Sequence, residues 1–132
     1  EYSPQSCSGN APHIRKVSTK ISSGAPPTAS LFSGSWLGHF RSRYSTPFCV
    51  NLSIIKIEKD GRAYGTYSWP SSSVDGGSIR FTGQVDGLRL RFSGRGGIKF
   101  VLYHTDDLQG SILQIQRLSD NGSVYGILRL IR

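Results

Sequence analysis

Residues that could support catalysis or bind a metal are few and scattered. The three histidines, His13, His39 and His104, lack the i, i+2 or H-x-x-x-H spacing that a metal site would use. His104 closely precedes Asp106 and Asp107, and a histidine beside carboxylates can act as a general acid or base. Short acidic segments are usually turns, however, so we predict no catalytic residue, no metal and no cofactor.

The chain contains two cysteines, Cys7 and Cys49. In an exported protein they most simply form one disulfide, joining the N-terminal segment to a strand, whereas in a cytosolic protein both would be buried thiols. The sequence starts at Glu1, contains no methionine and has no apolar run near the ~18 residues that a membrane span needs. We therefore expect a mature, secreted or periplasmic protein whose signal peptide has been removed.

Positive charge dominates the composition. Sixteen Lys and Arg residues stand against eight Asp and Glu residues, a formal net charge of +8. Such an excess raises the affinity for polyanions, including nucleic acids, anionic polysaccharides and anionic membrane surfaces. The alternative is that the charge only keeps a small exported protein soluble.

The amino-acid composition of the chain changes near residue 34. Residues 1–33 are rich in Ser, Pro, Gly and Thr, and we expect a tail or linker there, although sparse apolar positions leave room for a short docked segment. Residues 34–132 then form the single folded domain that 132 residues allow. An N-terminal segment of this composition also suggests that the chain is an accessory domain of a larger exported protein.

From about Ser35, short alternating runs are separated by turn signals at nearly even spacing, among them Asp60-Gly61 and Asp86-Gly87. A turn is also expected at residues 105–107. The pattern predicts an all-β protein, a single up-and-down antiparallel barrel of about eight strands with an irregular N-terminal tail. The expected strands cover about residues 35–44, 48–58, 62–69, 78–85, 88–93, 98–104, 108–118 and 123–132.

Alternation assigns the two faces of the hairpin around Asp86-Gly87. A two-residue turn would pair Val85 with Leu88, so the apolar residues of both strands would meet inside the barrel. The opposite, outward face would carry a basic stripe that could bind an anionic or acidic partner. The residues of this stripe are Arg80, Arg89 and Arg91, with Arg95 and Lys99 close by in sequence.

The mouth of the barrel is expected at Trp69, because this aromatic residue ends a strand just before the polar, Gly-rich loop of residues 70–77. Gly34-Ser35-Trp36, followed by Asp60-Gly61 and by Gly65-Thr66-Tyr67, resembles the calycin superfamily of lipocalins, fatty-acid-binding proteins and avidins. The motif match covers about residues 31–69. The resemblance implies that Trp36 packs across one end of the barrel, with Arg129 as a candidate partner, and that Tyr67 matches an avidin tyrosine that contacts ligand.

Several functions follow from these features. Since large apolar side chains would fill an eight-stranded barrel, binding of an anionic partner at the outer basic stripe is favoured for a non-catalytic exported module. The alternatives are a calycin-like carrier of a small apolar ligand held near Tyr67 and Trp69, the accessory domain, and an enzyme that uses the segment from His104 to Asp107. The natural ligand and the oligomeric state are not predicted.

Overall fold

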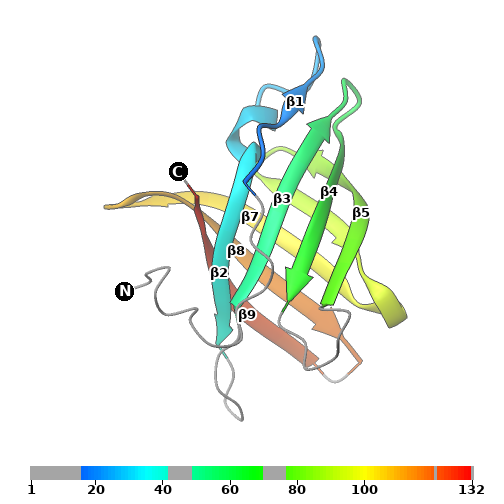
Figure 1. Ribbon diagram of the computed structural model, residues 1–132, viewed down its shortest axis with the longest axis vertical. Coiled ribbons are helices and arrows are strands. Elements are labelled where there is room, and N and C mark those ends of the chain that lie inside the picture. The colour runs from blue at the N-terminus through cyan, green and yellow to red at the C-terminus, as the bar shows by residue number, and fades with distance from the viewer. Residues whose placement is uncertain (1–15, 42–48, 70–76, 121, 132) are drawn as a thin grey trace.

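Eight antiparallel strands close into a barrel in the computed structural model, which describes residues 16–41, 49–69, 77–120 and 122–131 (Figure 1). Each strand pairs with its neighbours in sequence, and the pairing of the first barrel strand with the last closes the ring. The predicted up-and-down barrel is thereby confirmed. The barrel strands are β2 (Gly34–Arg41), β3 (Cys49–Ile57), β4 (Arg62–Trp69), β5 (Gly77–Asp86), β6 (Arg89–Ser93), β7 (Lys99–Asp107), β8 (Gly110–Ser119) and β9 (Gly122–Leu130).

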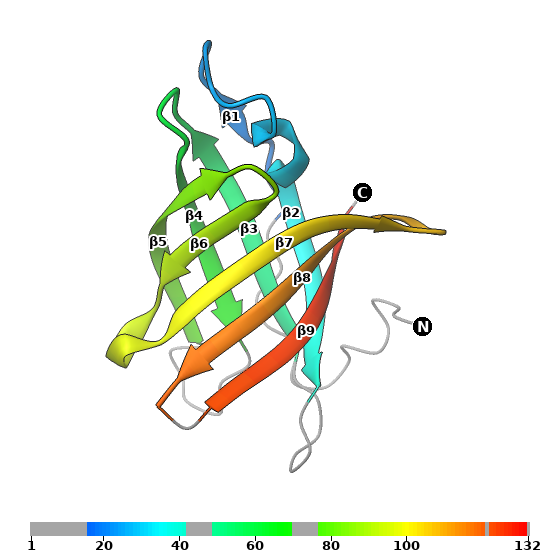
Figure 2. The ribbon, with the colours of Figure 1, turned by 180° about the vertical axis from the view of Figure 1, so that it is seen from behind.

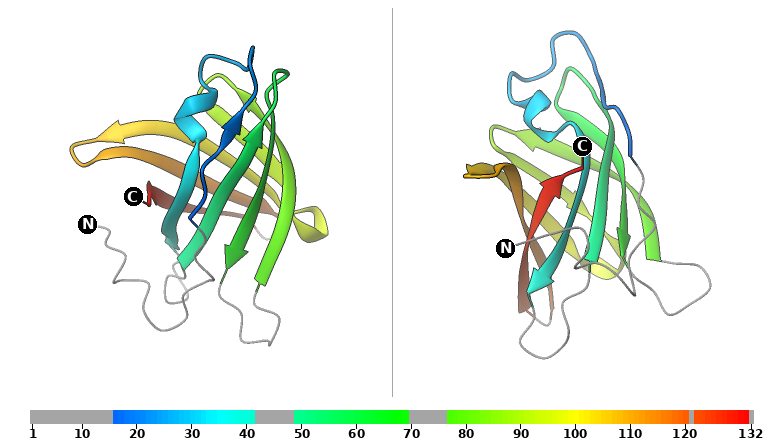
Figure 3. Two further views of the ribbon diagram at one scale, coloured as in Figure 1. Left: turned by 45° about the horizontal axis from the view of Figure 1, so that its top comes forward. Right: turned by 60° about the vertical axis from the view of Figure 1, so that its left-hand side comes forward.

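The turn between β7 and β8 lies further along the chain than predicted. Strand β7 continues through residues 105–107, and the turn is formed by Leu108 and Gln109. The side chain of Asp107 accepts a hydrogen bond from the Gln109 backbone N–H at 2.9 Å, which stabilises the turn after the acidic pair. The β7–β8 hairpin consequently extends beyond the barrel wall (Figure 3).

The β5–β6 register also differs from the expectation. Val85 pairs with Leu90, not with Leu88, because the central turn residues are Gly87 and Leu88. Gly87 has a φ of 60°, and glycine at the first central position is the requirement of a type II′ turn. The register is shifted by two residues, so both predicted faces are preserved. Only Leu88 leaves the interior, and it lies exposed in the turn.

Large side chains fill the middle of the barrel. Phe92 stacks between Phe81 and Phe100, with ring centroids 4.1 and 4.7 Å away. Fully buried leucines on β3, β6, β7, β8 and β9 complete this core. Apolar side chains from neighbouring strands thus pack against one another inside the barrel.

One end of the barrel is closed by residues that precede β2. A short strand, β1 (Lys20–Ile21), pairs in parallel with β3, and the 3₁₀ helix η2 (Ala29–Phe32) lies over the same end (Figures 1 and 2). Phe32 is completely buried, and its carbonyl oxygen accepts a hydrogen bond from Trp36 Nε1 at 3.3 Å. Residues 16–33 of the segment predicted as a tail thus lie against the barrel, and residues 1–15 fall outside the described part.

Trp36 points inward at this closed end, where its ring meets His104 edge-on at 6.5 Å. Arg129 pairs in register with Leu37, so it lies on the outward face, opposite to Trp36. There it donates two hydrogen bonds to the Asp107 carboxylate. The register therefore does not support the predicted stacking of Arg129 on Trp36.

The Cys7–Cys49 disulfide remains a prediction, since Cys7 lies outside the described residues. Cys49 itself is buried at the start of β3. Among the helical segments that the structure describes, none is long and apolar enough to cross a membrane.

The ion pair of Asp107 with Arg129 predicts a specific pH dependence of stability. Hydrogen bonds from Arg129, assisted by the Gln109 backbone, lower the pKa of Asp107 from 3.8 to about 2. Because the folded state holds this carboxylate in its charged form, the resulting stabilisation is present above pH 3.8 and is lost as the pH falls towards 2. In urea titrations, Asp107→Asn should be less stable than the wild type at neutral pH, and the two should converge near pH 2. If the unfolding free energies of the two proteins changed in parallel with pH, the ion pair would contribute nothing to stability.

Candidate functional site

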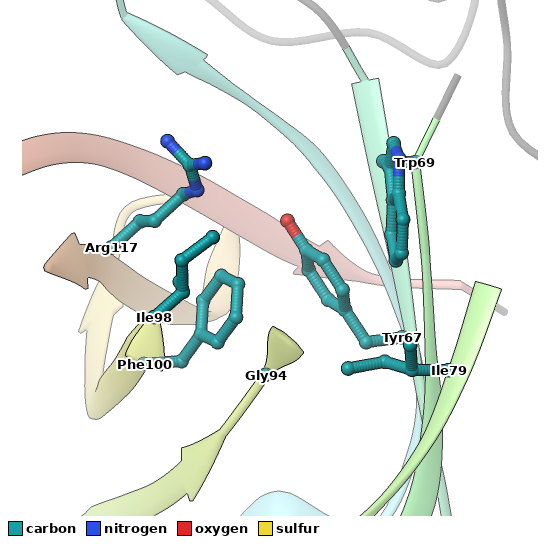
Figure 4. A pocket seen from close by; sticks show the side chains of 7 residues that line it. All are labelled: Tyr67, Trp69, Ile79, Gly94, Ile98, Phe100 and Arg117. Carbon is teal, nitrogen blue, oxygen red and sulfur yellow. The ribbon is translucent and has the colours of Figure 1, made fainter. Parts of the chain in front are cut away.

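A pocket of about 290 Å³ lies at the end of the barrel where β4 ends and β5 begins, opposite η2. Figure 4 shows the side chains that line it. We call it the mouth pocket. Its walls come from the end of β4, the start of β5, the β6–β7 connection, the start of β7 and the end of β8. The residues that line it are Tyr67, Trp69, Ile79, Gly94, Ile98, Phe100 and Arg117.

Strand alternation in β4 places Tyr67 and Trp69 on the inward face and Ser68 on the outward face, where Ser68 Oγ donates to Ser78 Oγ at 3.3 Å. Trp69 pairs with Gly77 across the β4–β5 ladder. A Cβ atom on Gly77 would lie 2.0 Å from the indole, so only glycine at this position allows the Trp69 ring to lie against β5. The predicted mouth residues Tyr67 and Trp69 thus both line the mouth pocket.

Tyr67 forms the floor of the pocket. Its ring is buried, with centroids 4.6 Å from Phe100 and 5.7 Å from Trp69. The hydroxyl points towards the side of the pocket that carries Arg117, and no hydrogen-bond partner for it occurs among the described residues (Figure 4). Burial raises the pKa of Tyr67 above its ordinary value, and the positive charge of Arg117 offsets part of the increase. The hydroxyl therefore stays neutral at physiological pH and can donate a hydrogen bond.

Among the described residues of the lining, Arg117 is the one charged side chain, and the sequence analysis missed it. It pairs with Phe100 on β7 and follows the buried residues Leu113 and Ile115 on the same face of β8, so it points inward. The described residues include no ion-pair partner for Arg117. A cation at an apolar position of an alternating strand was the signal that could have revealed it, because a desolvated charge without a partner is unfavourable.

The predicted basic stripe lies elsewhere, on the outer face of β5, β6 and β7. Arg80, Arg89, Arg91 and Lys99 are exposed there, and Arg91 pairs with Asp86 at 3.7 Å. Arg95 lies in η3 (Arg95–Gly97), and the position of its side chain falls outside the described part of the structure. The structure thus separates Arg80, Arg89, Arg91 and Lys99 from the mouth pocket by the barrel wall.

His104 and its neighbouring carboxylates do not come together. The His104 ring lies at the closed end, with its centroid 6.2 Å from that of Phe32. Asp106 accepts a hydrogen bond from Ser111 at 3.2 Å, and Asp107 pairs with Arg129. In the parts of the chain that the structure describes, no cluster of three His, Cys, Asp or Glu residues could hold a metal ion.

No family model matches this sequence, and neither a curated protein nor a solved structure matches the chain. The closed eight-stranded antiparallel barrel is consistent with the calycin-like fold that the motifs around Trp36 and Tyr67 resemble. Any function must therefore be argued from the site itself.

Proposed function

We propose that the protein binds a small apolar molecule carrying an anionic group, such as a medium-chain carboxylate, in the mouth pocket, and catalyses no reaction on it. The observation that carries this proposal is the inward position of Arg117 beside aromatic walls, with no anionic partner among the described residues. The proposal retains an exported, calycin-like binding module and its preference for an anion. It moves that preference from the outer basic stripe to the barrel mouth.

The walls of the mouth pocket suit an apolar body. Trp69, Ile79, Ile98 and Phe100 supply most of the lining, and burying a ligand against such surface is favourable by roughly 25 cal/mol per Å². The volume of about 290 Å³ lies near the lower end of the range for small-molecule sites. The filled core below Tyr67 excludes a longer ligand that would reach the closed end.

Arg117 and Tyr67 define where the anionic group would lie. A guanidinium can donate two parallel hydrogen bonds to a carboxylate, and the neutral Tyr67 hydroxyl can donate a third. An anionic ligand would neutralise a charge that is only partly solvated in the free protein. Hydrogen bonds to charged groups contribute about 1.5–3 kcal/mol each, which corresponds to about tenfold to a hundredfold in affinity.

The test compares octanoate with 1-octanol, which share a chain but differ in charge. We expect octanoate to bind at least about tenfold more tightly in calorimetric titrations. Octanoate should also change the fluorescence of Trp69, whereas Trp36 is buried at the far end and should not respond. Trp69→Phe should therefore abolish the optical signal. Equal affinities for the two ligands, or no binding of either, would refute the proposal.

A further inference from the structure

The outer face of the barrel carries two adjoining grooves, of about 420 and 330 Å³, that share Val101. We call them together the outer furrow. Its cationic half contains Arg62, Arg91 and Lys99. Its aromatic half contains Tyr103, Gln116 and Tyr125. Since the mouth pocket faces the interior, the outer furrow is a separate site.

Strand register builds the outer furrow from side chains that are far apart in sequence. One row runs across four strands, from Arg91 on β6 through Val101 and Gln116 to Tyr125 on β9. The neighbouring row joins Arg89 to Tyr103 on β7. These strands lie side by side in Figure 2. Alternation points all of these side chains outward, so cations and aromatic rings share one continuous surface.

The cations of the furrow are available to an anion. Lys99 is exposed and has no ion pair among the described residues. Arg91 pairs with Asp86 at 3.7 Å and Arg62 pairs with Asp60 at 3.5 Å, but both pairs are largely exposed. Exposed ion pairs contribute little, so an incoming phosphate can replace the carboxylate at small cost.

The aromatic half offers rings to a planar partner. Tyr103 and Tyr125 have 41% and 60% of their surface exposed. Gln116 Nε2 donates to the Tyr125 hydroxyl at 3.0 Å, which holds this ring in place beside the amide. The two tyrosines lie two strands apart, a separation of about 10 Å across the sheet. Exposed rings next to amides are suited to stacking and hydrogen bonding with nucleobases.

We propose that the outer furrow binds single-stranded nucleic acid, with phosphates on the cationic half and bases stacked on Tyr103 and Tyr125. Sequence-independent single-strand binding combines a basic groove with aromatic platforms, and the outer furrow has both. The net charge of +8 adds long-range attraction for such a chain. A sulfated polysaccharide would use the cations alone and would leave the two rings without a role.

The test compares a labelled oligodeoxythymidylate of about 12 nucleotides with an abasic oligomer of equal length and charge. Fluorescence anisotropy should show the thymidylate binding about tenfold or more tightly, because each stacked base adds severalfold to affinity. Raising the salt concentration from about 50 to 200 mM should weaken the binding of both oligomers. The logarithm of the binding constant should fall against the logarithm of the salt concentration with a slope near −2, as expected for about three contacted phosphates. Equal binding of the two oligomers, competition by dextran sulfate as effective as by thymidylate, or no binding at low salt would overturn the proposal.

Variants test the role of each half of the outer furrow in binding. Tyr103→Ala combined with Tyr125→Ala should remove the preference for thymidylate and leave the abasic affinity nearly unchanged. Arg91→Gln combined with Lys99→Gln should weaken both oligomers to a similar degree. Leu108→Ala is the matched control, because Leu108 is also an exposed apolar residue but lies in the β7–β8 turn outside the furrow. Circular dichroism checks that each variant folds, and an unaltered preference in the folded tyrosine variant would refute base stacking.

Discussion

Replacing Arg117 with alanine should weaken the binding of octanoate about tenfold to a hundredfold and leave the affinity for 1-octanol nearly unchanged. The carboxylate loses the one cationic partner that the described residues of the mouth pocket offer, whereas the apolar chain keeps the walls formed by Trp69 and Phe100. Isothermal titration calorimetry of both ligands measures the two affinities independently of tryptophan fluorescence.

Two further substitutions separate the charge of Arg117 from its bulk. Arg117→Lys keeps the charge but cannot form the bidentate pair, so it should recover only part of the octanoate affinity. Arg91→Ala removes one positive charge from the outer face and should leave octanoate binding unchanged. An equal loss for octanoate and 1-octanol in Arg117→Ala would show that Arg117 merely forms a wall.

Arg117 also links the site to stability. Its charge is partly buried among Tyr67, Ile98 and Phe100, and the described residues offer it no carboxylate. Replacing an unpaired, desolvated charge with an apolar side chain is often neutral or stabilising. Arg117→Leu should therefore keep or raise the free energy of unfolding while it abolishes the preference for octanoate. A stabilised variant that no longer discriminates charge would identify Arg117 as a residue kept for binding.

Replacing Phe32 with alanine should lower the free energy of unfolding by about 3–5 kcal/mol, the usual cost of truncating a fully buried aromatic side chain. Phe32 belongs to the closed end, where its ring lies against His104 and its carbonyl oxygen holds Trp36. Removing the ring leaves a cavity that the surrounding strands cannot fill, because they are held by the barrel ladder. Urea denaturation followed by circular dichroism measures the change.

Ser30→Ala is the matched control for Phe32, since Ser30 lies exposed in the same 3₁₀ helix. A surface substitution of this kind should change stability by no more than about 0.5 kcal/mol. A loss below about 1 kcal/mol in Phe32→Ala would instead mean that η2 is a loosely attached tail. The expected outcome makes residues 29–32 part of the barrel core, where they close one end.

Much of the barrel could be read from local signals. Strand β4 begins and ends where the sequence predicted, because a period of two and the flanking Asp60-Gly61 turn are properties of adjacent residues. Trp69 was placed at the mouth because it ends a strand before a polar loop, whereas Tyr67 was singled out by the resemblance to avidins. The β5–β6 register was predicted wrongly because the turn at Gly87 is compatible with two registers. The position of the β7–β8 turn was predicted wrongly because it depends on the side chain of Asp107, which accepts a hydrogen bond from the Gln109 backbone.

The sequence by itself determined the strands, their faces and the apolar interior, since alternation and turn chemistry act over a few residues. Only the tertiary structure decided which end of the barrel is closed, because η2 has no periodicity and is ordered by contacts with β2 and β7. The same holds for the site. Arg117 lines the same pocket as Tyr67 only because ring closure brings β8 opposite β4, an arrangement that depends on every intervening pairing and that no local pattern encodes.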